Sequence, residues 1–397
     1  MELSTDKPLS DLLSEHHQLA SQDPRFQIAI SRSISRRCNV FAIDISRLDQ
    51  EHCKFMETRS NMSHDPDVLR YIKDELGPDA FMLRISGGQR WTSESPRYLG
   101  NCSWRFDVSL SNGDVVNNGH PTLPPCGDVT LTGVWLPWHP VDHMYPPAFV
   151  IPPRKGFSPL MGQYHFLPDG CHLYHAGNQF LQDHSACTVR KMGEEWNVLF
   201  LGDSHMRFVL HSWQYRLAGH TGYYPEKEKP EWKKSVVTYN DSSYYFNWSP
   251  YAKDWHIAVQ AEDLENIDAI VASYAAWPAM NGITAAEYTE HLIHGLDIVD
   301  QHATLRLKRK VWLTSAPFPP WTKPDRKERR TNAQMAYWNR VTKRIVKERG
   351  WMIVDQFDLG MPLVLEIASG DGVHLSPSDA HAVIVDDVLA KAGICPH

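Results

Sequence analysis

The second half of the chain alternates between short apolar runs and longer segments in which apolar residues recur every three or four positions. The runs predict buried strands, and the longer segments predict helices with one apolar face. The predicted strands cover 198–201, 267–272, 311–314 and 352–354, and the predicted helices cover 205–217, 285–301, 332–348 and 378–392. Because strands that alternate with helices favour a parallel sheet covered on both faces, we expect an α/β fold with three layers, α/β/α, in this half.

The first half has a different pattern, with short strand-like runs and frequent turn residues. We expect helices at 9–20 and 67–76, strands at 39–45, 81–85, 104–110 and 129–135, and a hairpin turn at Asn112-Gly113. The predicted regions are a mixed helix and strand region at 1–80, a β-rich accessory domain at 81–150, a proline-rich linker with a Cys/His segment at 151–190, and the α/β domain at 191–397. The aromatic stretch 239–255 either forms an antiparallel hairpin at the edge of the sheet or lies beside the functional site of this half.

One junction between a predicted strand and helix carries residues suited to nucleophilic catalysis. The strand 198–201 ends in Gly202-Asp203-Ser204, and a helix follows at once. Backbone N–H groups and the helix dipole favour developing negative charge at this position. Sites in parallel sheets also form beyond the carboxyl ends of strands, which is where this serine falls. The same residue types cap helices in turns that have no catalytic role, so the turn alone does not assign a function.

A second motif, Asp371-Gly372-Val373-His374, supplies the partners that a serine nucleophile needs. In a tight turn the carboxylate of Asp371 can reach one imidazole nitrogen of His374, and the other nitrogen is left to take the proton of Ser204. Arg207 follows Ser204 by nearly one helical turn and so lies on nearly the same face. It could anchor an anionic or hydroxylated substrate, or pair with a carboxylate.

These motifs resemble those of the SGNH (GDSL-type) hydrolase superfamily. Within this superfamily, the chain is similar to the PC-esterase branch, which includes trichome-birefringence-like polysaccharide O-acetyltransferases and NXPE-like proteins. The similarity consists of Gly202-Asp203-Ser204 followed by Arg207, and of the distant Asp371-x-x-His374. The resemblance covers roughly residues 165–397. It implies an SGNH-like fold, acyl transfer or ester hydrolysis through an acyl-serine on a polysaccharide or glycan, and no cofactor. The acyl donor is left open.

The oxyanion hole departs from the superfamily pattern. An asparagine normally follows the third strand, but the chain after 267–272 reads Ser273-Tyr274-Ala275-Ala276-Trp277-Pro278. The first asparagine beyond this point is Asn281. Besides the backbone N–H of Ser204, the candidates for oxyanion or substrate binding are therefore Gly202, Asp203, Arg207, Ser273 and Asn281. We expect Asp203 to hold the turn rather than to transfer a proton.

The composition and net charge of the chain bear on the kinds of partner that it could bind. The chain has 397 residues and a net charge of −7 without charge blocks, which argues against nucleic acid because phosphate binding needs a basic face. No apolar run has the length of a membrane helix, and residues 1–23 lack the apolar segment of a secretory signal. There are 14 tryptophans, which either fill the core or form platforms for sugar rings.

The spacing of the cysteines bears on the cellular compartment in which the protein is expected to reside. Cys102 with Cys126, and Cys171 with Cys187, are close enough in sequence to close modest disulfide loops. Together with the resemblance, this favours the Golgi lumen or secretion, with a targeting segment absent from this sequence; the cytoplasm is the alternative. Cys171, His175, His184 and Cys187 also have the residue types of a zinc site, although their spacing matches no common finger, and we predict no metal.

Two other functions remain open at the level of sequence. The chain could be a glycan-binding or scaffold protein with a degenerate SGNH fold, which the missing asparagine favours and the intact serine, histidine and aspartate oppose. It could also hydrolyse lipids or small esters, which a preference for long acyl chains would reveal.

Overall fold

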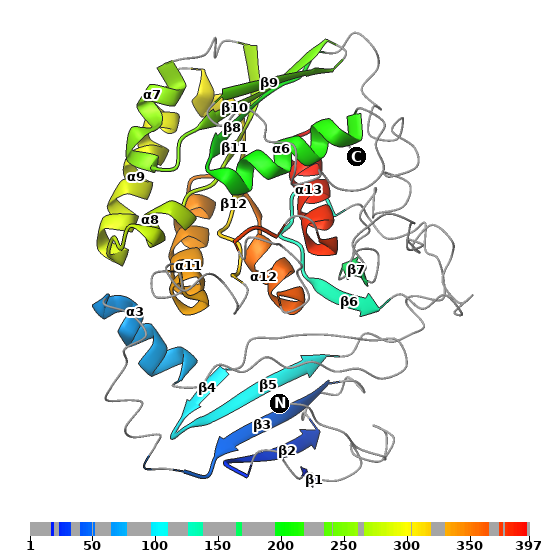
Figure 1. Ribbon diagram of the computed structural model, residues 1–397, viewed down its shortest axis with the longest axis vertical. Coiled ribbons are helices and arrows are strands. Elements are labelled where there is room, and N and C mark those ends of the chain that lie inside the picture. Colours follow the sequence, from blue (N-terminus) through cyan, green and yellow to red (C-terminus); the bar gives the residue numbers. More distant parts are fainter. Residues whose placement is uncertain are drawn as a thin grey trace, which may run out of the picture. The chain divides into compact units, whose positions relative to one another are not determined.

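The computed structural model describes two compact units of the chain. The described residues are 17–19, 24–32, 40–49, 51, 65–77, 97–109, 126–137, 164–168, 195–217, 234–239, 241–260, 266–302, 304–318, 330–364, 373–375 and 378–394. The N-terminal unit comprises Met1–Ser86 and Thr92–His120, and the C-terminal unit comprises Gly87–Trp91 and Pro121–His397. Each unit has a sheet of its own (Figure 1).

The N-terminal unit is built on an antiparallel sheet of five strands in the order β1-β2-β3-β5-β4. The strands are β1 (His17–Leu19), β2 (Phe26–Arg32), β3 (Val40–Arg47), β4 (Arg97–Gly100) and β5 (Ser103–Ser109). Alternate residues such as Ile43 and Ile45 are buried, as the period of a strand requires. The prediction of a β-rich N-terminal region is confirmed.

A short helical segment accompanies this sheet, at the place where the sequence predicted one. Helix α3 (Pro66–Tyr71) begins after Asp65, whose carboxylate accepts hydrogen bonds from the first-turn N–H groups, and a π-helical turn, η1 (Ile72–Leu76), continues it. The indole of Trp104 donates to the carbonyl of Leu76 at 2.7 Å, which ties this segment to β5.

Two predictions differ from the N-terminal unit as observed. The helix expected at 9–20 is wrong where the structure describes that range, because Leu19 pairs with Ile28 and draws β1 into the sheet. The boundary expected between 80 and 81 divides this sheet, because β3 and β5 are hydrogen-bonded neighbours from the two sides of it. The strand at 81–85 and the turn at Asn112-Gly113 lie outside the described residues, as does the predicted linker and Cys/His segment at 151–190 except for 164–168.

The C-terminal unit contains a sheet of six strands in the order β13-β12-β11-β8-β10-β9. The strands are β8 (Asn197–Gly202), β9 (Lys234–Tyr239), β10 (Ser242–Trp248), β11 (Ile267–Ala272), β12 (Arg309–Leu313) and β13 (Met352–Val354). All neighbouring pairs are parallel except β9 and β10, which form an antiparallel hairpin. The four strands predicted for this half are confirmed. The stretch 239–255 contains all of β10 but only the last residue of β9, so most of the first strand of the hairpin precedes it. Of the two strands of the hairpin, β10 lies inside the sheet and β9 lies at an edge. A separate two-stranded sheet joins β6 (Gly133–Pro137) and β7 (Tyr164–Pro168).

Helices cover both faces of the six-stranded sheet (Figure 1). They are α6 (Ser204–Leu217), α7 (Trp255–Gln260), α8 (Ala276–Met280), α9 (Ala285–Gln301), α11 (Asn332–Glu348), α12 (Gln356–Gly360) and α13 (Asp379–Lys391), with 3-10 turns η3 (Ala252–Asp254), η5 (Leu305–Leu307) and η6 (Met361–Leu363). The four predicted helices are confirmed. Thr284, Thr331 and Ser378 cap α9, α11 and α13 with their side-chain oxygens.

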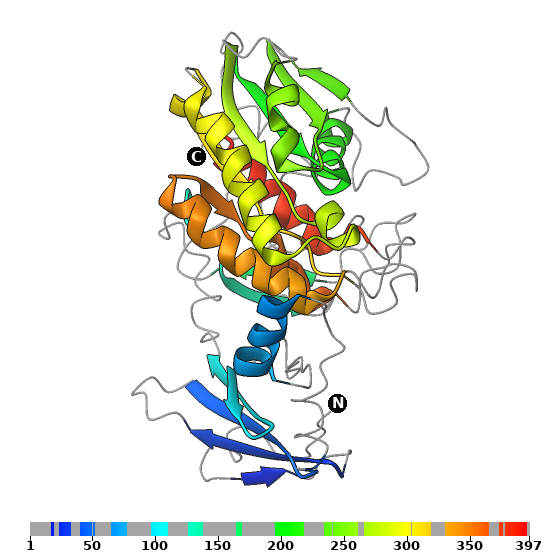
Figure 2. The same cartoon turned by 90° about the vertical axis from the view of Figure 1, so that its left-hand side faces the viewer.

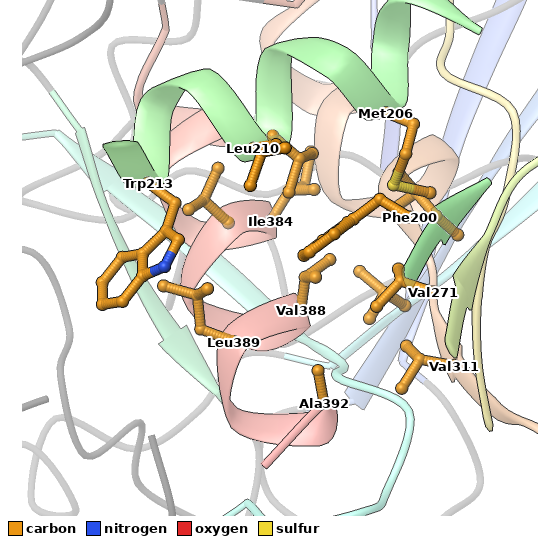
Figure 3. Close-up of a cluster of buried hydrophobic side chains, with 14 of the residues drawn as sticks. Phe200, Met206, Leu210, Trp213, Val271, Val311, Ile384, Val388, Leu389 and Ala392 are labelled. Carbon is orange, nitrogen blue, oxygen red and sulfur yellow. The ribbon is translucent and has the colours of Figure 1, made fainter. Parts of the chain in front are cut away.

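The side chains of β8 divide between two cores. Val198 and Phe200 belong to the core beneath α6 and α13, whereas Leu199 and Leu201 belong to the core beneath α9 and α11. Figure 3 shows Phe200 directed toward side chains of α6 and α13, and Figure 2 shows α9 and α11 side by side on the other face. A strand that is buried on both faces is expected for a parallel sheet, and this confirms the three-layer prediction. In the part of the chain that the structure describes, no helix is long and apolar enough to cross a membrane.

Candidate active site

The predicted nucleophile lies where the topology of the sheet changes direction. The chain passes from β8 to β10 on one side and then returns to β11 on the other side of β8. Connections that leave in opposite directions open a crevice beyond the carboxyl ends of the two strands, and ligands bind there in open α/β sheets. Ser204 follows β8 and Ser273 follows β11, so both residues lie at this edge of the sheet.

Gly202 is the point at which three strand ends meet. Its carbonyl accepts a hydrogen bond from Ser249 N at 2.9 Å, and Ser273 N donates to the neighbouring carbonyl of Leu201 at 3.0 Å. A Cβ atom added to Gly202 would lie 3.1 Å from Met206 Cβ and 3.1 Å from the carbonyl oxygen of Ser273. The absence of a side chain therefore lets β11 approach the turn that carries Ser204.

Asp203 makes the contacts expected of a residue that holds the turn. Its buried carboxylate accepts a hydrogen bond from His205 N at 2.9 Å, and its carbonyl accepts one from Arg207 N at 3.1 Å. Burial raises the pKa of the Asp203 carboxyl, while the hydrogen bond from His205 and electrostatic interactions with His374, Arg330 and Arg207 act in the opposite direction. The side-chain oxygen of Asp203 thus caps the start of α6 beneath the site.

Ser204 and His374 are in hydrogen-bond contact. The distance between Ser204 Oγ and His374 Nε2 is 2.6 Å, and both side chains are partly exposed. His374 is anchored by its two buried neighbours: Val373 belongs to the core beneath α9 and α11, and Leu375 to the core beneath α6 and α13. The two motifs, 170 residues apart, are therefore brought together. Asp371 lies outside the described residues, and its bond to His374 stays a prediction.

The imidazole of His374 packs against two rings that the sequence analysis did not select. Its centroid lies 4.5 Å from that of Phe208 and 4.9 Å from that of His205, with interplanar angles of 54° and 49°. Phe208 follows Ser204 by four positions, so helix geometry places it on the same face of α6. That spacing was the available signal for Phe208.

Arg207 is buried rather than directed to solvent. Its guanidinium carbon lies 5.7 Å from the centroid of Trp248 and 5.8 Å from that of Phe208. Trp248 ends β10 and is the register partner of Gly202, which brings it beside the site. Burial and the charge of Arg207 together lower the pKa of His211, one turn further along α6, to about 4.

The two candidates for a further oxyanion donor lie in different surroundings. Ser273 is buried next to Gly202. Asn281 is exposed, and its side-chain amide donates to the hydroxyl of Tyr251. The structure thus brings Ser273 to the turn that carries the serine, and it joins Asn281 to the segment that follows β10.

The alternatives built on cysteine and histidine are not decided by the structure. Cys171, His175, His184 and Cys187 lie outside the described residues. Among the residues that are described, no group of three or more His, Cys, Asp or Glu side chains could hold a metal ion. The pairings of Cys102 with Cys126 and of Cys171 with Cys187 stay predictions.

Comparisons with known proteins give only remote likenesses. No protein-family model and no curated protein matches the chain. Among solved structures, a GDSL-like lipase from Bacteroides thetaiotaomicron is 11% identical, covers 54% of this chain and 96% of its own, and gives a TM-score of 0.35. A peptidoglycan O-acetylesterase is 11% identical, covers 53% of this chain and 95% of its own, and gives a TM-score of 0.34. At these TM-scores the likeness assigns neither a family nor an activity to this chain.

Proposed function

We propose that this protein is a serine-dependent esterase or acyltransferase of SGNH type that acts on an acylated glycan. The observation that carries the proposal is the 2.6 Å contact between Ser204 Oγ and His374 Nε2 beyond the carboxyl end of β8. A serine paired with a histidine at a helix N-terminus has its nucleophile, its base and a favourable electrostatic position together. Both side chains are partly exposed, so a substrate can reach them.

The chemistry follows from this pair. His374 Nε2 removes the hydroxyl proton of Ser204 as Oγ forms a bond to the ester carbonyl carbon, and the same proton then passes to the departing alcohol. The product is an acyl-serine. Water attacks the acyl-serine in an esterase and a sugar hydroxyl attacks it in a transferase, with His374 again serving as the base. Asp371 is assigned the role of holding the imidazole tautomer and stabilising its protonated form.

The negative charge that develops on the carbonyl oxygen needs donors. The N–H of His205 donates to the carboxylate of Asp203, so we assign the N–H of Ser204, at the start of α6, to the oxyanion. Ser273 adjoins Gly202 at the end of the neighbouring strand and is the candidate for a further donor.

The motifs favour one branch of the superfamily. Arg207 three residues after Ser204, with Asp371-x-x-His374 near the C-terminus, supports the PC-esterase branch. That assignment favours acetyl groups, a polysaccharide or glycan acceptor and the secretory pathway. Transfer to a sugar hydroxyl and release to water use the same residues, so the acceptor must be found by assay.

A second serine–histidine pair in the same chain provides a matched control. Ser212 Oγ and His381 Nε2 are 2.9 Å apart, but both side chains are buried between α6 and α13. The test is acetate release from acetylated oligosaccharides, with and without an added acceptor sugar. Ser204→Ala should abolish both release and transfer, whereas Ser212→Ala should retain them. Sugar binding without turnover in the unmutated protein would instead favour the non-catalytic function.

A further inference from the structure

The end of β10 and the segment that follows it contact helix α8 and its C-cap residue through two side-chain pairs. Trp248 and Trp277 pack edge to face, with ring centroids 5.6 Å apart and an interplanar angle of 85°. Beside this pair, the amide of Asn281 donates to the hydroxyl of Tyr251. Trp277 and Asn281 are joined by a backbone hydrogen bond of 3.1 Å between Asn281 N and Trp277 O, so they lie one turn apart on the same side of α8. We call these four residues the Trp248–Trp277 strip.

The strip is partly exposed to solvent, whereas several other aromatic residues of this unit are fully buried. Trp248, Trp277 and Tyr251 are partly exposed and Asn281 is exposed. In the same unit, Trp255, Trp312 and Trp338 are fully buried. Indole surface that remains in contact with solvent loses the stabilisation that burial gives, so the solvent-facing parts of these two neighbouring tryptophans are available to a ligand.

The strip begins next to the candidate nucleophile. Trp248 is the register partner of Gly202, two residues before Ser204, and the guanidinium of Arg207 lies 5.7 Å from the Trp248 ring. Arg207 is itself buried, so this contact supports the Trp248 ring from the protein side. A molecule bound along the strip would therefore extend to the serine.

The chemistry of the strip suits a sugar. Indole and phenol rings offer flat apolar faces to the C–H groups of a pyranose, while the phenol hydroxyl and the amide can donate to and accept from its hydroxyls. None of the four side chains carries a formal charge at neutral pH. Among the described residues, two cations lie against rings of the strip: the buried Arg207, 5.7 Å from the Trp248 ring, and Lys253, whose Nζ lies 5.9 Å from the Tyr251 ring.

We propose that Trp248, Trp277, Tyr251 and Asn281 form a binding subsite for a neutral sugar ring adjacent to the ester on which Ser204 acts. The inference rests on the proposed function for the identity of that neighbouring ester. Binding of the sugar itself does not require turnover. In this assignment Asn281 contacts substrate rather than the oxyanion.

The test measures binding in a Ser204→Ala background, so that turnover does not enter. Isothermal titration with xylohexaose, cellohexaose and chitohexaose gives the dissociation constants. Trp277→Ala should weaken binding of the tightest of these ligands by about tenfold, which is the size of effect expected for a tryptophan at the centre of an interface. Asn281→Ala, an exposed change that leaves the packing intact, should weaken it by about threefold. The control is Trp196→Ala: Trp196 is partly exposed, precedes β8 at the opposite end of the sheet and donates to the carbonyl of Ala392.

Unchanged affinity in both the Trp277 and the Asn281 variants would overturn the inference, and so would the absence of binding to all three sugars. Equal weakening in the Trp196 control would do the same, because the effect would then be general. Failure of the proposed function has a different signature. In that case the unmutated protein would bind the sugar through the strip but would release no acetate.

Discussion

Replacing Gly202 with alanine tests whether the close approach of β11 positions the nucleophile. The new Cβ would lie 3.1 Å from both Met206 Cβ and the Ser273 carbonyl oxygen, where ordinary contact begins at 3.4 Å. A movement of about 0.3 Å is therefore required, being the difference between these two distances. Met206 Cβ and the Ser273 carbonyl belong to a helix and to a strand end, so neither can rotate away.

Gly202→Ala should lower both the free energy of unfolding and the rate at which Ser204 is acylated. Overpacking of this kind costs about 1–3 kcal/mol, and each kcal/mol lowers Tm by about 2–4 °C in a domain of this size. Because a 1 Å misplacement of reacting groups costs about a hundredfold in rate, a shift of a few tenths of an ångström at Ser204 should slow acylation by about three- to tenfold. The assay is the second-order rate of labelling by a fluorophosphonate, with Tm measured on the same samples.

A glycine far from the serine provides the control. A Cβ on Gly295 in α9 would lie 2.8 Å from the Ala252 carbonyl oxygen, a closer contact than at Gly202. Gly295→Ala should therefore lower Tm at least as much and leave the labelling rate unchanged. If Gly202→Ala labels at the unmutated rate, or if Gly295→Ala slows labelling equally, the positional role of Gly202 is refuted.

Three further predictions concern the neighbours of the site and the core. Phe208→Ala removes the ring packed 4.5 Å from His374 and should slow labelling about tenfold, whereas Phe208→Tyr should restore the rate and Val209→Ala should lower only Tm. The pKa of His211 is lowered to about 4 in the folded protein, so between about pH 6.5 and pH 4 only the unfolded chain binds a proton at this imidazole. The free energy of unfolding should therefore fall as the pH falls through this range. Urea titrations of His211→Gln should show a flatter dependence of the free energy of unfolding on pH. Lys391→Met leaves the buried carboxylate of Asp387 without its ion-pair partner and should cost about 3–5 kcal/mol in urea unfolding, which the double change with Asp387→Leu should largely restore.

The layered fold could be predicted because the central strands are buried on both faces. Such strands contain short apolar runs, as at 198–201 in β8 and 269–272 in β11. The strand β10 was less evident because it contains the polar residue Asn247. In the fold, the Asn247 amide donates to the carbonyl of Ala258 at 3.2 Å, a contact that only the tertiary structure supplies.

Of the candidate site, only the residues in its two sequence motifs could be predicted from the sequence. Ser204 and His374 each lie in short motifs with recognisable chemistry, and the structure brings them together. Trp248 and Trp277 lie in separate segments, and their contact depends on the parallel pairing of β10 with β8. No local pattern encodes that pairing, since strand order is set by packing of the whole sheet.

The most direct test of the central claim is labelling of the purified protein with a fluorophosphonate probe, read by intact mass. An activated serine at Ser204 should give one label per chain. Ser204→Ala and His374→Ala should each abolish labelling, while Ser212→Ala should retain it. A protein that stays unlabelled under conditions where a known serine esterase reacts fully, or that labels equally well without Ser204, would contradict the account.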